Sequence, residues 1–377
     1  MEKLIDLLFQ WNVLHAWYYA ASFFIIISII VFIHELGHYT VAKLFGVKVE
    51  AFSIGFGKEL VGWNDRSGTR WKISLLPLGG YVRMFGDANP ASFPELGINE
   101  LPESQRKQAF FFKPLWIKAA VVFAGPFANF LLTFCILSGF FYVYGQRIVL
   151  PIADEIMPNT PAFAAGIKAG DKVLKVDGEN VNSFADLQRI ISLHPGITVT
   201  LVIERSGKPI TLAVTPKDYT TKDIFGNETR IGLLGIASKT EAETHPLSLP
   251  NAMGEAVKET YDMSASTLLA MKQMVVGQRS VKELGGPIKI AKYSGQSVHR
   301  GWKTAIWFVA VLSLNLGLIN LFPIPVLDGG HIFIYAIQGI IRRPIPPKIL
   351  EYGMRVGLAL ISALMIFVIL NDIMGYF

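Results

Sequence analysis

The short stretch HELGH, residues 34–38, contains two histidines and a glutamate at helical spacing. On a helix, residues four apart share a face, so the imidazoles of His34 and His38 can reach the same ion. Glu35 is rotated away from that direction but stays beside the ion, where its carboxylate can take a proton from water. This HExxH spacing predicts a zinc site with hydrolytic chemistry.

The surroundings of HELGH argue against a chance match. A lone histidine is often only a hydrogen-bonded core residue, and this chain has seven histidines. HELGH, however, follows the apolar run WYYAASFFIIISIIVFI, residues 17–33, which is suited to lipid. A charged side chain at the centre of a membrane helix costs about 2.5–3.5 kcal/mol on insertion scales, so such groups are kept mostly where they function. The zinc interpretation is therefore favoured.

A third metal ligand is expected near the stretch LNLGLINLFPIPVLDGGH, residues 314–331. A hydrolytic zinc usually has three protein ligands and leaves one position open. Pro323 and Pro325 cannot continue a helix and would hold the backbone open, and Asp328 follows them with a carboxylate. The alternative is that DGG only makes a turn, with Asp328 as its cap. Beside HELGH, the ligand role of Asp328 is favoured.

Four stretches are long and apolar enough to cross a bilayer core of about 30 Å as helices. The chain has 377 residues, of which 51% are hydrophobic and 17% are charged, a balance typical of membrane proteins. The N-terminus lacks the basic segment and cleavage site of a secretory signal, so the first span is expected to be retained. The sequence predicts a polytopic α-helical membrane protein with four transmembrane helices, at residues 17–45, 115–144, 304–322 and 356–375.

Charges in the loops predict the orientation of these spans. The loop 46–114 is rich in lysine and arginine, and the loop between the last two spans carries Arg342, Arg343 and Lys348. By the positive-inside rule both loops are cytoplasmic, and both termini and the long middle segment face the other side. The net charge of +6 is spread over loops rather than gathered in a stripe, which argues against nucleic acid as a partner. The single cysteine, Cys135, lies in the second span and forms no intrachain disulfide.

Two β-rich segments are expected inside the loop 46–114. VKVEAFSIGFG (47–57) and TRWKISLLPLGGYVRMFG (69–86) flank the turn-forming cluster WNDRSG, which predicts a β-hairpin. Several strand residues are apolar on both faces, so the hairpin would lie against or dip into the membrane. A small soluble subdomain packed on the cytoplasmic helix ends is an equal alternative.

The middle of the chain has the composition of a soluble α+β domain. Residues 147–242 contain four strand-like runs broken by Gly, Pro and Asn turns, and one amphipathic helix at 183–193. PNTPAFAAGIKAGDKVLKVDGENVNSFADLQRII resembles the PDZ domains of bacterial proteases. Residues 243–302 have helical periodicity and are interpreted as a helical linker near the outer membrane surface, or alternatively as a plain spacer. The PDZ ligand is not predicted, and the domain could bind a peptide or exclude bulky clients.

Three motifs together resemble the site-2 protease family of intramembrane zinc metalloproteases. They are HELGH in the first span, AGPFAN (124–129) in the second, and NLFPIPVLDGG (320–330) after the third. Three further features are similar to those of the bacterial regulator-of-sigma-E protease branch. They are the four spans, which lie in the segments 1–45, 115–146 and 303–377, the stretch GFGKEL, and an inserted PDZ domain. Some members of that branch have two tandem PDZ domains, whereas this chain has room for one.

The resemblance implies roles for individual residues. His34, His38 and Asp328 match the family's zinc ligands, and Glu35 matches its catalytic glutamate. Asn315 and Asn320 match asparagines associated with holding substrate, and Pro323 and Pro325 match the break in the helix. The resemblance implies that all four are substrate-binding residues.

The expected activity is that of a zinc endopeptidase in the bacterial inner membrane that cuts transmembrane segments. Its expected partners are the lipid bilayer and single-span membrane proteins, such as a trimmed anti-sigma factor or remnant signal peptides. Two alternatives stay open. A zinc transporter should show repeated motifs in its two halves, and none is visible. An inactive PDZ-containing membrane scaffold would be expected to lose Glu35, which is present.

Overall fold

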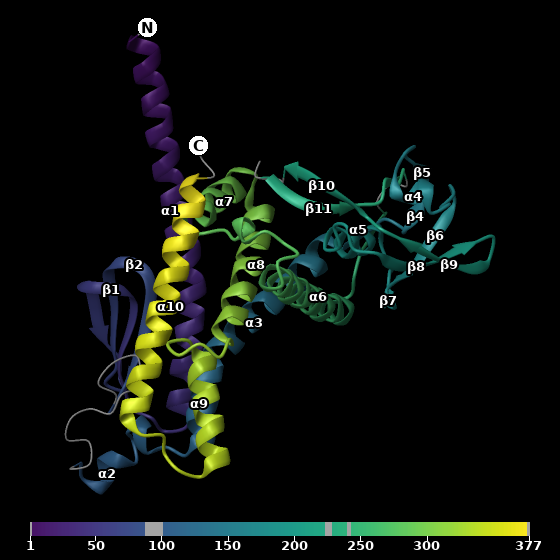
Figure 1. Ribbon diagram of the computed structural model, residues 1–377. Helices are drawn as coiled ribbons and strands as arrows, with labels where there is room; N and C mark the ends of the chain where they lie inside the picture. Colours follow the sequence, from purple (N-terminus) through teal and green to yellow (C-terminus); the bar gives the residue numbers. More distant parts are fainter. Residues whose placement is uncertain (1, 87–100, 223–227, 240–242, 375–377) are drawn as a thin grey trace. The chain divides into compact units, whose positions relative to one another are not determined.

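The computed structural model describes residues 2–86, 101–222, 228–239 and 243–374 (Figure 1). These residues form two compact units, one made of residues 1–136 and 284–377 and the other of residues 137–283. Helix α3 (Leu115–Tyr144) crosses the boundary between the units. The other elements of the first unit are α1 (Glu2–Leu44), β1 (Val49–Asn64), β2 (Arg70–Met84), α2 (Glu103–Arg106), the 3-10 helix η2 (Phe110–Phe112), α7 (Pro287–His299), α8 (Trp302–Asn320), α9 (Asp328–Ile341) and α10 (Pro347–Met374).

Four helices meet the length and composition of a membrane span, as the sequence predicts. They are Trp17–Leu44, Leu115–Tyr144, Trp302–Asn320 and Lys348–Met374. The fourth begins earlier than the predicted residue 356, because α10 takes in the charged first turns around Glu351 and Arg355. Residue 375, the predicted end of this span, lies outside the described residues.

The connection between the last two spans, which was predicted to be a loop, is partly helical. It contains the 14-residue helix α9. The apolar part of α9, residues 332–341, is too short to register as a span of about 20 residues. Arg342 then ends the helix in a left-handed conformation, with φ of 56°.

Helix α1 ends in a way that its sequence explains. Gly46 has φ of +65°, a conformation that costs glycine little. The N–H of Gly46 donates to the carbonyl of Lys43, and the N–H of Val47 donates to the carbonyl of Ala42, which is the Schellman arrangement. The ammonium of Lys113 donates to the carbonyl of Phe45 at 2.8 Å. These bonds satisfy the last carbonyls of α1 and turn the chain into β1.

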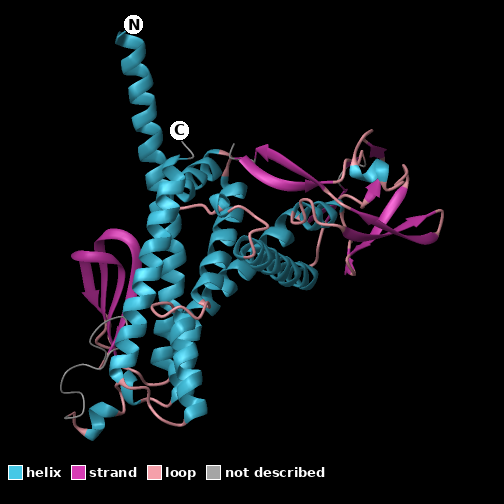
Figure 2. Ribbon diagram, in the orientation of Figure 1, coloured by secondary structure: helices cyan, strands magenta, loops and turns pink. Residues whose placement is uncertain are grey.

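Strands β1 and β2 form the predicted hairpin, but β1 extends beyond the predicted residue 57 to Asn64, and both strands bend (Figure 2). The middle part of β1 pairs on both sides, with Phe52 opposite both Val82 and Trp71. The hairpin is therefore folded into a sheet of four segments, in the order 80–84, 49–54, 70–74 and 59–64. Residues 80–84 lie at one edge of this sheet, and β1 and β2 both contact α1.

The turn between β1 and β2 is organised by Asp65. One carboxylate oxygen accepts from the backbone N–H groups of Ser67 and Thr69, and the other accepts from the hydroxyl of Tyr39 and the indole of Trp71, both at 3.0 Å. Loss of hydration opposes ionisation of Asp65, but hydrogen bonds led by Ser67 and Trp71 hold its pKa below the usual range. Because Tyr39 belongs to α1, this turn is attached to the helix that carries HELGH.

A cluster of buried side chains joins the ends of these elements. It includes residues of α1, β1, β2, η2, α3 and α9, so it fixes the sheet and α9 against the end of α1. Its buried members are Ala42, Val47, Val49, Met84, Phe110, Val121, Val122 and Tyr335.

The second unit contains an antiparallel sheet with strand order β4-β6-β8-β9, to which β7 adds on β6. Its helix α5 (Phe184–Ser192) begins with a capping box between Ser183 and Asp186, and buries Leu187, Ile190 and Ile191 against the sheet's core. Helix α5 and strands β6, β8 and β9 lie where the sequence predicts them, whereas β10, β11 and β12 were not predicted. The remaining bounds are β3 (Gln146–Ile148), β4 (Ile152–Ala153), β5 (Glu155–Ile156), α4 (Pro161–Ala164), β6 (Asp171–Val176), β7 (Glu179–Asn180), β8 (Val199–Arg205), β9 (Lys208–Val214), β10 (Lys217–Lys222), β11 (Glu228–Leu233), β12 (Ile236–Ala237), β13 (Glu243–His245), α6 (Leu249–Val275) and the 3-10 helix η3 (Val281–Glu283).

In the first unit, α10 is tied to the start of α7 by one carboxylate. Asp372 is fully buried, and it accepts from the backbone N–H groups of Gly286, Ile288 and Lys289 at 3.0–3.1 Å. These are N–H groups that the first turn of a helix leaves without a partner in the helix itself. Asp372 therefore caps the N-terminus of α7 although it belongs to α10, and the positive end of the α7 dipole favours its charge.

Replacing Asp372 by alanine should lower the apparent unfolding temperature of the protein in detergent micelles. Three N–H groups, one buried and two partly buried, would lose their acceptor, a loss of about 2–3 kcal/mol in unfolding free energy. The matched control is Glu351→Ala, which removes only an exposed pair with Arg355 on the same helix. Equal unfolding temperatures for the two variants would contradict the capping role of Asp372.

Candidate metal centre

His34 and His38 lie on one face of α1, as their spacing predicts. Both side chains are buried, and their Nε2 atoms are 3.2 Å apart. The two rings are nearly perpendicular, at 84°. Two imidazole nitrogens at that distance can bind the same metal ion.

Asp328 is brought to the histidines by the loop between α8 and α9. It is the first residue of α9 and directly follows the N-cap residue, Leu327. Its Oδ2 lies 3.1 Å from Nε2 of His34, and its Oδ1 lies 3.6 Å from Nε2 of His38. Asp328 therefore lies beside both histidines, and its role as a metal ligand stays a prediction.

The loop that delivers Asp328 is held in an unusual conformation. Val326 has φ of 97°, a region that a β-branched residue rarely enters. Gly329 and Gly330 pack so closely on the loop that a Cβ atom at either would lie 2.2 Å from a carbonyl oxygen, of Leu321 or Ile324. Such strain persists only where the surrounding structure enforces it, and it clusters at functional sites.

The three side chains fit a zinc ion. Their donor atoms all lie within 4.8 Å of one another. With zinc–nitrogen bonds of about 2.0–2.1 Å, tetrahedral ligands are about 3.3 Å apart. The two Nε2 atoms are 3.2 Å apart, and the carboxylate places Oδ2 at 3.1 Å from that of His34 and Oδ1 at 3.6 Å from that of His38. Two imidazoles and one carboxylate leave a fourth position open, which is the ligand set of a hydrolytic zinc site.

The second ring nitrogen of each histidine is engaged by α3. Nδ1 of His38 is 2.9 Å from the backbone carbonyl of Val121. A carbonyl can only accept, so Nδ1 carries the proton, and in neutral His38 the lone pair is on Nε2, facing His34 and Asp328. Nδ1 of His34 is 3.1 Å from Nδ2 of Asn129, a fully buried residue of α3. The Oδ1 atom of Asn129 has no hydrogen-bond partner among the described residues.

Two glycines allow α1 and α3 to approach this closely. A Cβ atom on Gly37 would lie 2.2 Å from the carbonyl oxygen of Ala124. A Cβ atom on Gly125 would lie 2.2 Å from Nε2 of His38 and 2.9 Å from Cε1 of His34. Small residues at a helix contact let the backbones come together in a membrane. Here they bring α3 directly onto the imidazoles.

Glu35 lies beside both the edge of the sheet and the donor residues, but it is not one of the donors. Its carboxylate accepts a hydrogen bond from the backbone N–H of Val82. A Cβ atom on Gly80 would lie 3.0 Å from Cγ of Glu35 and 2.9 Å from Cγ1 of Val31. The edge segment 80–84 therefore lies along α1 beside the carboxylate, a contact that the local sequence pattern does not indicate.

The four predicted substrate-binding residues are near the loop that carries Asp328, but none belongs to the donor cluster. Asn315 is half-buried within α8, and Asn320 is the last residue of that helix. Pro323 is exposed and Pro325 is half-buried. A Cβ atom on Gly357 would lie 2.1 Å from the carbonyl oxygen of Pro325, so α10 packs on this part of the loop.

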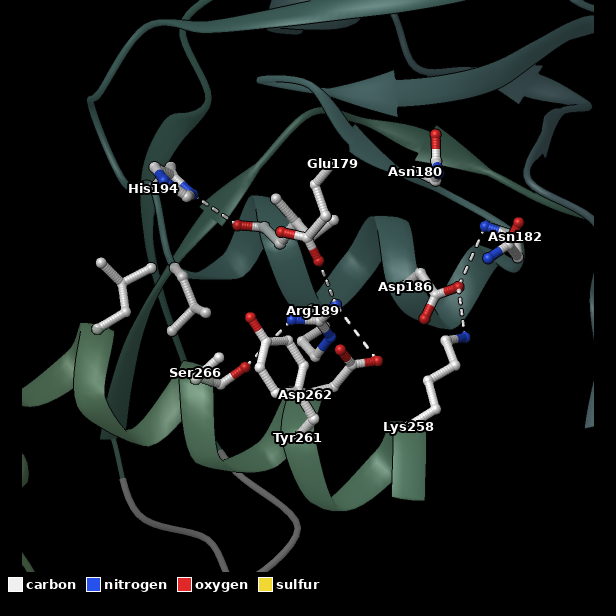
Figure 3. Close-up of a pocket in the computed structure, with 14 residues that line it drawn as sticks. Glu179, Asn180, Asn182, Asp186, Arg189, His194, Lys258, Tyr261, Asp262 and Ser266 are labelled. Atoms are coloured by element: carbon white, nitrogen blue, oxygen red, sulfur yellow. Dashed lines mark hydrogen bonds and ion pairs between the residues drawn. The ribbon is translucent and has the colours of Figure 1, made fainter. Parts of the chain in front are cut away.

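The second unit has a polar cavity of its own, with a volume of about 420 Å³, between α5 and α6 (Figure 3). Arg189 of α5 is at its centre, within 2.7 Å of Glu179, 3.2 Å of Ser266 and 3.9 Å of Asp262. Burial raises the pKa of Asp262, and Arg189 opposes that rise. The cavity contains none of the donor residues, and its charges pair with one another across the two helices.

Comparison with known sequences extends over almost the whole chain. The profile of peptidase family M50 matches residues 22–364. A protein of Brucella suis, named provisionally as a zinc metalloprotease, is 42% identical over 360 residues, which is 93% of this chain and 94% of that protein. A similarly named protein of Agrobacterium fabrum is 40% identical over 359 residues, 94% of this chain and 95% of that one. The metalloprotease MmpA of Caulobacter vibrioides is 34% identical over 378 residues, again 94% and 95%.

Comparison with solved structures is less informative. The PDZ domain of the SdrC-like protein from Listeria innocua is 22% identical, with a TM-score of 0.19, and the match covers 26% of this chain and 100% of that domain. A TM-score of 0.19 is too low to assign a fold to this region. The assignment of residues 147–242 as one PDZ domain therefore stays a prediction.

The close contact at Gly125 yields a test of the metal centre. Gly125→Ala should weaken zinc binding at least about tenfold, since the new methyl group would displace the imidazole of His38 from its ligand position. Gly139→Ala, on the same helix with nothing within 4 Å of the added Cβ, should bind zinc like the unaltered protein. Zinc content would be measured by metal analysis of both purified variants. Unchanged zinc in Gly125→Ala would rule out the site.

Proposed function

We propose, from the premise that this chain belongs to peptidase family M50, the site-2 protease family, that it cleaves membrane-spanning segments of other membrane proteins. The chain is a zinc metalloprotease of that family. Its four long apolar helices fit a multi-pass membrane protein. The observation that carries the proposal is the place of the metal centre: His34 and His38 lie within the first apolar helix, not on a soluble domain.

His34, His38 and Asp328 would hold the zinc ion, which, when bound, polarises a peptide carbonyl and makes water easier to deprotonate. Glu35 is the proton carrier of the reaction. Its carboxylate takes a proton from the attacking water, whose oxygen joins the carbonyl carbon, and returns a proton to the nitrogen as the C–N bond breaks. The backbone N–H of Val82 holds that carboxylate on the side of α1 that faces the sheet.

A substrate helix must unwind before its carbonyls can be attacked, and the sheet supports the unwound form. Residues 80–84 are an edge of the four-segment sheet and lie beside Glu35. An extended peptide that adds to a sheet edge gains main-chain hydrogen bonds. A peptide strand added here would pass the catalytic carboxylate. Asn315 and Asn320 are proposed to bind backbone groups that unwinding exposes.

The sheet is proposed to contact the membrane. Several apolar side chains on it are exposed, which is costly in water and favourable at a lipid surface. Among them are Leu60, Val61, Trp63, Leu75 and Leu76, each more than half exposed.

Clients, compartment and the remaining domain follow as proposals from the same premise. The substrates are single-span membrane proteins whose outer domain has been removed, such as anti-sigma factors or remnant signal peptides. The loop 46–114 is cytoplasmic, and residues 147–242, a PDZ domain, face the opposite side of the bacterial inner membrane. The long helix α6 is a linker near the outer membrane surface. Family membership speaks against the zinc transporter, and the placement of Glu35 beside the donor cluster speaks against the inactive scaffold.

Two substitutions should separate the roles of the site residues. Glu35→Gln should lower cleavage of a trimmed single-span client by about 10²–10⁴-fold and keep zinc, because Glu35 is outside the donor cluster. Asp328→Ala should lose both zinc and cleavage. Purified variants would be compared by metal analysis and by gel assay of the client. In cells, the Glu35→Gln strain should accumulate truncated single-span proteins. Full activity of Asp328→Ala would refute its role.

The orientation can be tested with single cysteines in a Cys135→Ala background. Arg66→Cys is in the turn of the hairpin and Lys208→Cys is at the start of β9, and both positions are exposed. A membrane-impermeant maleimide added to intact spheroplasts should label Lys208→Cys at once and Arg66→Cys only after permeabilisation. Labelling of both positions without permeabilisation would be incompatible with the proposed layout.

A further inference from the structure

One face of α3 contacts both histidines of the metal centre. Val121, Gly125 and Asn129 are spaced four apart, so they lie on the same face. Val121 accepts from His38, Gly125 packs on both rings, and Asn129 meets His34. Asn129 is the last residue of the AGPFAN stretch and is fully buried. The proposed reaction gives it no role.

The hydrogen bond between Asn129 and His34 depends on which ring nitrogen carries the proton. For Nε2 of His34 to bind zinc, the neutral ring must carry its proton on Nδ1. Nδ1 is then a donor and needs an acceptor. The amide group has two ends of nearly the same shape, and a rotation of 180° exchanges Oδ1 with Nδ2. In the structure Nδ2 faces His34 and Oδ1 has no partner among the described residues, so exchanging the two ends breaks no hydrogen bond of Oδ1. The proton on Nδ1 of His34 therefore determines the orientation of the Asn129 amide, because it needs Oδ1 as its acceptor.

We propose that Asn129 is a positioning residue of the zinc centre, whose Oδ1 accepts the hydrogen bond from Nδ1–H of His34. This bond holds the imidazole with Nε2 directed at His38 and Asp328. Partners of this kind behind a metal-ligating histidine fix its tautomer and orientation, and their loss typically weakens metal binding 10–100-fold. The inference rests on the proposed role of His34 as a zinc ligand.

The surroundings of Asn129 make it a rigid support. Its backbone carbonyl accepts from the hydroxyls of Ser313 at 2.9 Å and Thr133 at 3.0 Å. A Cβ atom on Gly317 would lie 3.2 Å from the Cβ of Asn129, so α8 packs closely against it. The side chain is thus fixed between α3 and α8 and has little freedom to leave His34. Asn129 therefore connects α8 to His34, the proposed zinc ligand on α1.

Two variants distinguish an acceptor from a mere space-filling residue. Asn129→Leu keeps the approximate shape but removes the hydrogen bond, and zinc affinity, measured by competition with a chelator, should fall about 10–100-fold. Asn129→Asp keeps an acceptor and removes the donor, so its zinc affinity should stay close to that of the unaltered protein. With cobalt in place of zinc, the visible absorption spectrum should change for Asn129→Leu and be retained for Asn129→Asp.

The controls are Thr133→Val and Ser313→Ala, which remove hydrogen bonds to the backbone of Asn129 but do not touch His34. Each control keeps the other of these two hydrogen bonds and the close packing of Gly317 on Asn129, so both should bind zinc normally. Thermal unfolding of every metal-free variant would report folding. Unchanged affinity in Asn129→Leu would overturn the proposal. So would loss of affinity in Asn129→Asp, which would mean that the amide donates; this comparison holds even if Asn129→Leu does not fold. Absence of zinc from the unaltered protein would instead refute the proposed function itself.

Discussion

The metal centre depends on how closely α1 and α3 approach each other. At Gly37 and Gly125 no side chain separates the helices, and a single added carbon at either position would overlap a carbonyl oxygen or an imidazole. This contact lets one face of α3 reach both histidines. Without it, His34 and His38 would still share a face of α1, but nothing would fix the direction of their rings. The HExxH spacing therefore brings the two imidazoles close together, and the glycines allow α3 to fix the direction of the rings.

Burial makes the orientation of these rings selective. In an apolar environment a polar atom without a partner costs about 1–3 kcal/mol, so the second nitrogen of each ring must find one. Val121 supplies a carbonyl to His38, and Asn129 supplies an amide to His34. Once these bonds are made, the remaining nitrogens converge on Asp328, whose loop is forced into place by Val326, Gly329 and Gly330. Three donors without a metal would be a costly arrangement, which is consistent with a zinc site.

Much of this centre could be predicted from the sequence, because it depends on local periodicity. The spacing of His34 and His38 implies a shared face, and the prolines after α8 imply a break before Asp328. The contacts of Asn129 and Val82 could not be predicted, because they depend on which turn of one helix, or which strand edge, meets another element. Helix α9 was missed for a different reason: its apolar part is too short for a span. The folding of the hairpin into four segments depends on the pairing of Phe52 on both sides, with Val82 and with Trp71. An alternating sequence pattern does not specify this double pairing.

The central claim is that two imidazoles and one carboxylate from α1 and α9 hold the zinc. X-ray absorption at the zinc edge, on protein purified in detergent micelles, measures the ligand set directly. The expected first shell contains nitrogen and oxygen only, with the outer-shell scattering of two imidazole rings, and Asp328→Asn should alter the oxygen contribution while the two rings stay. A sulfur ligand from Cys135, or scattering from fewer than two imidazoles, would contradict the account.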